Sequence, residues 1–158
     1  MFLVASLLAL LSCDSLSEGT DAQAYATEMQ ALLVENNAIR REFFDVTVLV
    51  KKHELNTPEI ANRFADRVVP RAAALAEKVD AIQAKTSGLE QVHSGIERAW
   101  AIRAESYAAL SKAWTDADNA AFTRALHDNR SVRKAEERYI EAANRLLLEH
   151  EVQLDPYP

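Results

Sequence analysis

Residues 24–50 read AYATEMQALLVENNAIRREFFDVTVLV, and this stretch decides the fold class of the chain. Apolar side chains recur in it at alternating steps of four and three residues, which places them on one face of an α-helix. Neither glycine nor proline interrupts the stretch, so it predicts one long amphipathic helix with an apolar face to bury. The residues at these positions are Tyr25, Met29, Leu32, Asn36, Ile39, Phe43, Val46 and Val50.

The same spacing returns in three later segments, and local start signals separate them. Thr57 with Pro58 is a typical helix start, because threonine caps the helix and proline suits its first turn. The run SGLE at 87–90 is a capping box, and TDAD at 115–118 offers a further cap. The expected helices span residues 22–55, 57–85, 88–114 and 117–152.

Composition agrees with an all-helical fold of one domain. The chain has 158 residues, of which 3 are Gly and 4 are Pro, too few turn residues for a β-sandwich or a β-barrel. Helices of similar length joined by short turns run antiparallel to their neighbours. We therefore predict an all-α fold, an antiparallel up-down-up-down four-helix bundle over residues 23–155 that follows an N-terminal signal segment. Pro70 lacks a hydrogen-bond donor, so we expect a kink near residues 67–69.

The N-terminal residues have the pattern of an export signal. Residues 1–12, MFLVASLLALLS, are almost entirely apolar but too short to cross a hydrocarbon core of ~30 Å as a helix. The run Leu10-Leu11-Ser12-Cys13 resembles the lipobox of bacterial lipoproteins. The resemblance implies that residues 1–12 are a lipoprotein signal peptide, cleaved after Ser12, and that Cys13 carries a covalent lipid.

Residues 13–22 are polar and contain Ser15, Ser17, Gly19 and Thr20. This composition is typical of a flexible linker, so we expect a tether between the lipidated cysteine and the helical domain. The resemblance to lipoproteins also implies a location at the bacterial cell envelope, facing the periplasm. It leaves open whether the anchor lies in the inner or the outer membrane.

Charge and motif content exclude several classes of function. The 24 acidic and 18 basic residues give a net charge of −6, which argues against a nucleic-acid partner. Cys13 is the only cysteine, so neither a disulfide within the chain nor a cysteine metal site is expected. The single Glu-x-x-His motif, from Glu90 to His93, falls short of the two that a di-iron bundle needs. We expect no enzyme, no catalytic residue, no bound metal and no cofactor other than the lipid.

A basic run on the last expected helix has a simple interpretation. Acidic residues follow it at helical spacing, so we expect ion pairs within the helix and a solvated face. The basic residues are Arg130, Arg133, Lys134 and Arg138, and their expected partners are Glu137 and Glu141.

Polar residues occupy four positions on the expected apolar faces, namely Asn36, Arg103, Asn129 and Glu136. A buried arginine must be paired, because an unpaired charge in the core costs several kcal/mol. In one interpretation these residues set the register of the helices or lie at the exposed edges of the apolar faces, and Asn36→Leu should then raise stability or change the oligomeric state. In the other, they form a polar core pocket with Arg71, which binds a small anion through Arg71 and Arg103.

Two functional hypotheses remain open. The first is a lipid-anchored envelope protein that binds another protein as an accessory subunit or assembly factor, since small helical lipoproteins with such roles resemble this chain in size and anchoring. The second is a small-ligand or metal-binding four-helix bundle of the periplasm, which Pro70 and the buried polar positions suggest. In the first, the partners are the membrane, reached through the lipid, and an envelope protein.

Replacement of Cys13 tests the lipoprotein assignment. Cys13→Ser removes the thiol that would carry the diacylglycerol, and two acyl chains at ~0.8 kcal/mol per buried CH₂ are enough for stable anchoring. In a bacterial host, metabolic labelling should mark the wild-type chain and the Ser15→Ala control with fatty acid. The Cys13→Ser chain should remain an unlabelled, uncleaved precursor. A labelled Cys13→Ser chain of mature size would contradict the assignment.

Overall fold

The computed structural model of this chain describes residues 5–52, 57–86 and 88–156, with side chains for 17–48, 58–86 and 88–156. These residues form helices and connecting segments without any strand, so the all-α prediction is confirmed for them. No helix in the part described has both the length and the hydropathy to cross a membrane. The elements are α1 (Ala5–Lys52), α2 (Thr57–Arg67), α3 (Val69–Asp80), α4 (Leu89–Thr115), α5 (Asn119–Leu147) and the 3₁₀ turn η1 (Leu148–His150).

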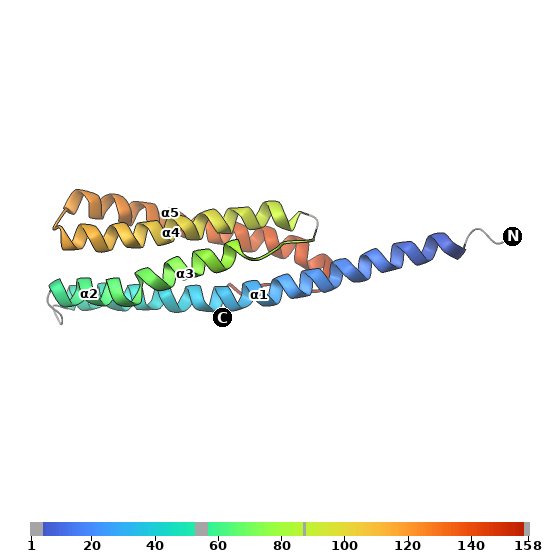
Figure 1. Cartoon of the computed structure of the whole chain (residues 1–158), viewed down its shortest axis with the longest axis horizontal. Helices are drawn as coiled ribbons and strands as arrows, with labels where there is room; N and C mark the ends of the chain where they lie inside the picture. The colour runs from blue at the N-terminus through green and yellow to red at the C-terminus, as the bar shows by residue number, and fades with distance from the viewer. Residues whose placement is uncertain (1–4, 53–56, 87, 157–158) are drawn as a thin grey trace.

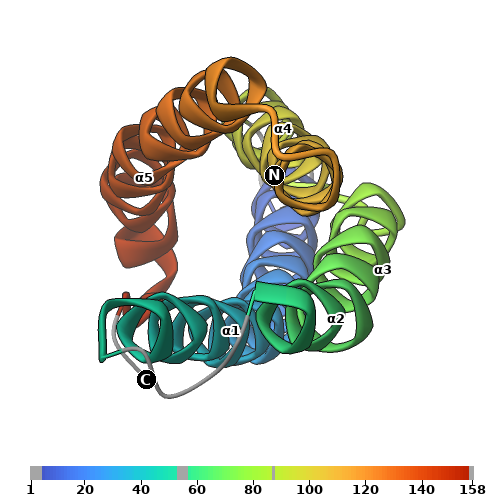
Figure 2. The same cartoon turned by 90° about the vertical axis from the view of Figure 1, so that its left-hand side faces the viewer.

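The helices lie in two layers along a common direction (Figure 1). Helices α2 and α3 lie along the second half of α1, while α4 and α5 form the other layer, and the start of α1 extends beyond both. Ion pairs join Glu35 of α1 to Lys78 of α3 and Glu42 of α1 to Arg63 of α2, so α1 and the α2–α3 pair run in opposite directions. Figure 2 shows that α5 begins far from α1 and approaches it toward its end.

Helix α1 begins at Ala5, well before the expected start at residue 22, so it includes residues 13–22, the segment predicted as a polar tether. Alanine and leucine dominate its first turns, and both are strong helix formers. Gly19 costs the helix about 1 kcal/mol relative to alanine but does not end it. A Cβ atom added at Gly19 would meet nothing within 4 Å. The side chain of Cys13 lies outside the described residues, so its lipidation stays a prediction.

The kink expected at residues 67–69 is confirmed as a break between α2 and α3, at Val68. Pro70 causes it, because proline has no N–H to donate to the carbonyl of Asp66. The amide of Val68 still donates to the Phe64 carbonyl over an N···O distance of 3.0 Å. The two short helices therefore continue in nearly the same direction on one side of α1 (Figure 1).

The second expected helix ends early, since α3 stops at Asp80. Beyond it, the segment 82–86 is extended, and its alternate residues Ile82, Ala84 and Thr86 turn to the interior while those between them are exposed. Side chains that alternate between the interior and solvent at every second residue are typical of an extended chain. A helix over the same residues would turn some of the exposed side chains inward as well. The turn between the second and third expected helices is therefore longer than predicted.

The starts of α4 and α5 differ in how they are capped. Gly88 precedes α4 with a left-handed φ of 78°, and a Cβ atom at this position would lie 3.3 Å from Leu146 Cδ1. The predicted capping box instead assigned this role to Ser87, which lies outside the described residues. At α5 the expected cap is confirmed, because Asp118 Oδ1 accepts the amides two and three residues later at 3.0 and 2.9 Å.

An extended tail, residues 151–156, follows η1 and joins α1 to α5, where the sequence predicted helix as far as residue 152. Asn144 of α5 accepts the Leu154 amide at 2.7 Å and donates to the Leu154 carbonyl at 3.0 Å. Gln30 of α1 binds Asp155 in the same way, at 2.8 and 3.3 Å. Leu154 is buried between these contacts. Two side-chain amides thus replace the helical hydrogen bonds that the tail gives up.

Asn144→Ala should loosen the tail, because it leaves the buried Leu154 amide and carbonyl without their protein partner. We expect the free energy of unfolding to fall by about 1–2 kcal/mol. We also expect the Leu154 amide to exchange with solvent faster, as measured by chemical denaturation and hydrogen exchange. Asn62→Ala, at an exposed position of α2, is the matched control and should change stability little. Equal stability of the two variants would contradict the role given to Asn144.

Candidate functional site

Three of the polar residues on the predicted buried faces meet in the centre of the molecule. Glu136 of α5 forms an ion pair with Arg103 of α4, with Arg103 Nη2 3.0 Å from Glu136 Oε2. Asn36 of α1 donates to Glu136 Oε1 at 2.9 Å and accepts from Arg103 at 2.5 Å. Trp100 Nε1 donates to the same carboxylate oxygen at 2.8 Å. One carboxylate therefore joins α1, α4 and α5.

Burial makes this cluster a strong constraint. Arg103 and Glu136 are 3% and 5% exposed, so removing either partner leaves an unpaired buried charge, at a cost of roughly 3–5 kcal/mol. Asn36 is 2% exposed and bonds both of them. Its amide therefore satisfies specific buried groups, which reverses the expectation that Asn36→Leu raises stability.

The other two predicted pocket residues separate. Asn129 of α5 lies beside the cluster and lines a cleft together with Arg103. Arg71 is exposed on α3 and lines neither this cleft nor its neighbour, so the predicted anion site through Arg71 is wrong. The reason is helical phase, because Ala72 takes the buried position of that turn and Arg71 faces solvent. Trp100 was missed, although a buried indole N–H needs an acceptor.

A cleft of about 520 Å³ lies between α1 and α5, with α4 contributing to its lining. Its volume falls in the range of ligand pockets, roughly 300–1,000 Å³. Guanidinium groups come from all three helices, and Asp45 is the one carboxylate among the lining residues. The arginines that line the cleft are Arg40, Arg41, Arg103, Arg130 and Arg133.

The basic residues of α5 face solvent, and some of them also line the cleft. Arg133 pairs with Glu137 at 3.0 Å, as the sequence predicted for this face. Arg130 also lines the cleft. The sequence had predicted only a solvated face for the basic run to which Arg130 belongs. Arg40 and Arg41 of α1 were missed, because their place opposite α5 depends on how the two helices lie relative to each other.

Two buried polar atoms on cleft residues have no hydrogen-bond partner among the described residues, namely Arg103 Nε and Asn129 Oδ1. The first is a donor and the second an acceptor. Each buried polar atom without a partner costs about 1–3 kcal/mol. Both atoms have almost no accessible surface, and the Asn129 side chain lies within hydrogen-bond reach of Tyr107.

Aromatic rings form the apolar wall of the cleft. Phe43 stacks on Tyr107 with ring centroids 5.0 Å apart and planes 20° apart, and Phe64 packs behind both. Burial raises the pKa of the Tyr107 phenol, so this ring stays uncharged at neutral pH. Phe44 also lines the cleft and is 64% exposed. The cleft therefore offers an apolar surface beside its positive charges.

A second pocket of about 230 Å³ adjoins this cleft and shares Asn37, Arg40 and Arg133 with it. It extends along α1 and α5 as far as Pro156 of the tail, and Glu137 is among its carboxylates. The two pockets together form an elongated site, with most of its positive charge at the wider end.

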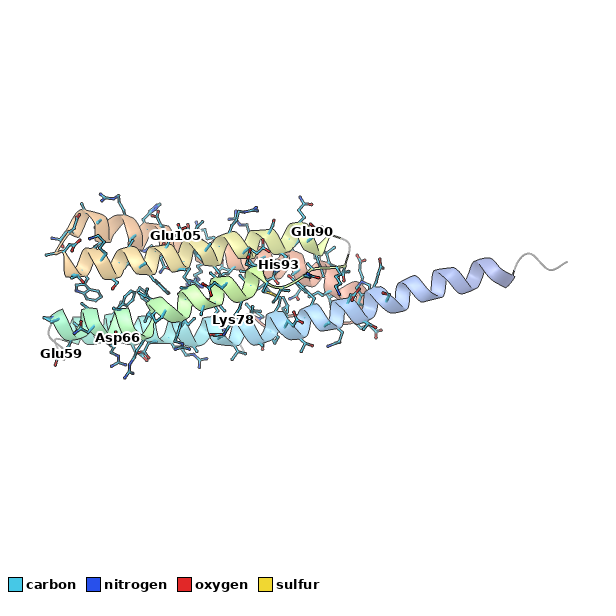
Figure 3. The ribbon with its side chains drawn as sticks, in the orientation of Figure 1. Glu59, Asp66, Lys78, Glu90, His93 and Glu105 are labelled. Atoms are coloured by element: carbon cyan, nitrogen blue, oxygen red, sulfur yellow. The ribbon has the colours of Figure 1, made fainter. Side chains whose placement is uncertain are left out.

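His93 belongs to a separate buried network, near the start of α4 (Figure 3). Its Nε2 donates to the Val79 carbonyl oxygen at 3.0 Å and lies 3.2 Å from Glu97 Oε1, and its Nδ1 is hydrogen-bonded to the Tyr25 hydroxyl at 3.0 Å. Tyr139 bonds Tyr25 at 2.8 Å, and burial raises the pKa of Tyr25 to about 12. Glu90 is exposed and takes no part. Both ring nitrogens of His93 are thus engaged, and the described residues contain no group of potential metal ligands.

Comparisons with known protein families, with curated proteins and with solved structures found no match for this chain.

Asn36→Leu should lower stability, because it leaves buried groups of Arg103 and Glu136 without one of their partners. We expect a loss of about 1–3 kcal/mol in the free energy of unfolding, measured by denaturant titration. Asn62→Leu, at an exposed position, is the control for the change in side-chain type. A more stable Asn36→Leu variant would restore the register interpretation.

Proposed function

We propose that this chain is a non-catalytic binding protein of the bacterial envelope, anchored by a lipid on Cys13, whose cleft between α1 and α5 receives an anionic group. One observation carries the proposal. The chain has a net charge of −6, yet five of its 18 basic residues line a single cleft. Guanidinium groups bind carboxylates and phosphates through paired hydrogen bonds, and their concentration in a cleft raises the local concentration of anions.

The proposal includes the finer architecture. We take α1, the broken helix α2–α3, α4 and α5 as the four members of an antiparallel up-down-up-down bundle that follows a signal segment. Contacts at the middle and at one end of the α4–α5 pair support this topology, since Trp100 bonds Glu136 and Trp114 packs on Phe122. Such a bundle provides ligand sites between facing helices.

The position of the cleft on α1 supports a ligand away from the anchoring membrane. Cys13 and Arg41 belong to the same helix, and at 1.5 Å per residue they lie about 40 Å apart along its axis. An anchor at Cys13 with α1 upright would hold the cleft beyond the lipid headgroups. The proposed ligand is therefore a component of the periplasm or of a neighbouring envelope protein.

A protein partner is the second candidate, in the accessory or assembly role that size and anchoring suggest. Phe44 at the cleft is 64% exposed and lies near Arg41 in the same helix. Exposed aromatic residues and arginines are enriched at protein interfaces. An acidic segment of a partner would then be the anionic group.

Anion binding by the purified full chain tests the proposal. Citrate and inorganic phosphate, titrated at constant ionic strength, should bind the wild type and raise its Tm. The double variant Arg40→Ala/Arg130→Ala should lose at least about tenfold in affinity, because each charged hydrogen bond contributes about 1.5–3 kcal/mol.

The matched control is Arg98→Ala/Arg138→Ala, which removes the same charge from exposed positions of α4 and α5. It should bind both anions as the wild type does, in calorimetry and in thermal melts. Equal binding by the two double variants, or no binding by the wild type, would refute an anion site in the cleft.

A further inference from the structure

A second row of residues at alternating steps of three and four runs along α1, on the side opposite its buried face. Five of its eight residues are apolar, yet none of the eight is buried. The solvent side of an amphipathic helix normally carries polar and charged residues instead. We call this row the outer face, and it consists of Ala24, Thr27, Ala31, Val34, Ala38, Arg41, Asp45 and Val48. The outer face therefore has the pattern of a second packing surface.

The outer face is accessible to a partner. Figure 2 shows α1 at the edge of the molecule, with the other helices above and beside it. Val34, near the centre of the row, is 50% exposed and is one of four exposed large apolar side chains among the described residues. The small side chains around it let a second helix approach closely. Thr27 donates its hydroxyl to the Gln23 carbonyl at 2.8 Å, so it keeps a hydrogen-bond partner when it is covered.

Two opposite charges on the outer face indicate what covers it. Arg41 and Asp45 lie one helical turn apart, and both are exposed. Neither forms an ion pair or a hydrogen bond within the described part of the chain. An arginine that precedes the acid is also the weaker order for a pair within one helix. A second copy of this face offers a negative charge for Arg41 and a positive charge for Asp45 at the same spacing.

These two charges pair across a parallel dimer. In a parallel pair of helices, each side chain of such a row packs into a hole formed by four residues of the other helix. One of these four lies one turn further along, so Arg41 of each copy meets Asp45 of the other, and two-fold symmetry forms this ion pair twice. An antiparallel pair that overlaps along the whole outer face would instead place Arg41 beside Ala31. It would place Asp45 beside Thr27, and both charges would be left without a partner.

The residues that flank the outer face also favour the parallel arrangement. Glu35 and Glu42 lie along one flank, whereas Gln30 and Asn37 lie along the other. In a parallel pair the two different flanks meet, so carboxylates of one copy face amides of the other. In an antiparallel pair like flanks meet, and carboxylates would face carboxylates.

We propose that two copies of this chain associate through the outer faces of α1, as a parallel two-fold dimer in which Arg41 of each copy pairs with Asp45 of the other. This arrangement places residue 13 of both copies at the same end of the dimer, as the proposed anchoring in one membrane requires. A shared membrane also raises the effective concentration of the two copies. The dimer does not depend on the anion site, so each proposal stands or falls without the other.

The mass of the purified full chain in solution tests the dimer. At about 0.1 mM, sedimentation equilibrium should give twice the chain mass of 17.6 kDa. Val34→Glu should raise the dissociation constant at least about tenfold, because two like charges would meet inside the interface. Ile102→Glu, which adds the same charge at an exposed apolar position of α4, is the matched control and should keep the wild-type mass. A monomeric wild type at this concentration, or equal dissociation constants for the two variants, would refute the dimer.

Exchange of the two charges tests the ion pairs. Arg41→Asp should weaken the dimer at least about tenfold, because carboxylates would then face one another across the interface. The double variant Arg41→Asp/Asp45→Arg places opposite charges at these positions again and should recover the wild-type dissociation constant. Such a recovery separates the ion pair from a folding defect, which a second substitution would not repair. A double variant that dissociates as readily as Arg41→Asp would contradict the pairing.

A disulfide tests the orientation of the two copies. Ala24→Cys, made in the Cys13→Ser chain, introduces one thiol near the start of the outer face. In the parallel dimer the two substituted positions are neighbours, within the Cα–Cα range of about 4.4–6.8 Å that a disulfide needs. In an antiparallel dimer they would lie about 36 Å apart. Mild oxidation should therefore cross-link this chain, but not the Asn62→Cys control on α2. A chain of dimeric mass that does not cross-link through residue 24 would overturn the parallel arrangement.

Discussion

The buried carboxylate of Glu136 is the constraint on which the rest of this molecule depends. It accepts hydrogen bonds from Asn36 on α1 and from Trp100 and Arg103 on α4, so three helices are fixed relative to one another at a single level. Because a buried charge without its partner is so costly, these helices cannot slide independently. The cleft opens beside this level, and Arg103 belongs to both. The ion pair that stabilises the core therefore also holds Arg103 in place in the lining of the cleft.

Local rules account well for where the helices are interrupted and less well for where they end. Pro70 lacks a donor and Asp118 carries a capping oxygen, so the break and the start of α5 follow from single residues. The end of α3 and the tail depend instead on tertiary packing. Segment 82–86 carries no helix breaker, and it is extended because alternate residues reach the core. Leu154 lies in a tail whose partners come from residues far away in sequence, such as Gln30 of α1.

The candidate site could be predicted only in part, because its buried network follows from local sequence patterns whereas its cleft depends on tertiary packing. Polar residues on apolar faces signal a buried network, and Asn36, Arg103 and Glu136 do form one. The separation between α1 and α5 places Arg40 and Arg130 on the two sides of one cleft. This separation cannot be derived from the sequence. Helix α4 packs against α5 in its own layer and against α3 in the other layer. A helical pattern identifies the buried face of each helix but not the angle at which two helices cross.

Helix α1 contains both Cys13, the proposed attachment point, and residues that line the cleft. It runs without interruption from Ala5 to Lys52, through Cys13 and on to the arginines at the cleft. As long as the helix stays straight, a tilt of its first turns reaches the cleft as a rigid rotation, and a small change of angle at residue 13 becomes a large sideways displacement at the far end. Gly19, whose missing Cβ would touch nothing, is the residue between them where the helix bends at least cost. One half-buried glycine thus sets how far the first turns of α1 can change direction relative to the cleft.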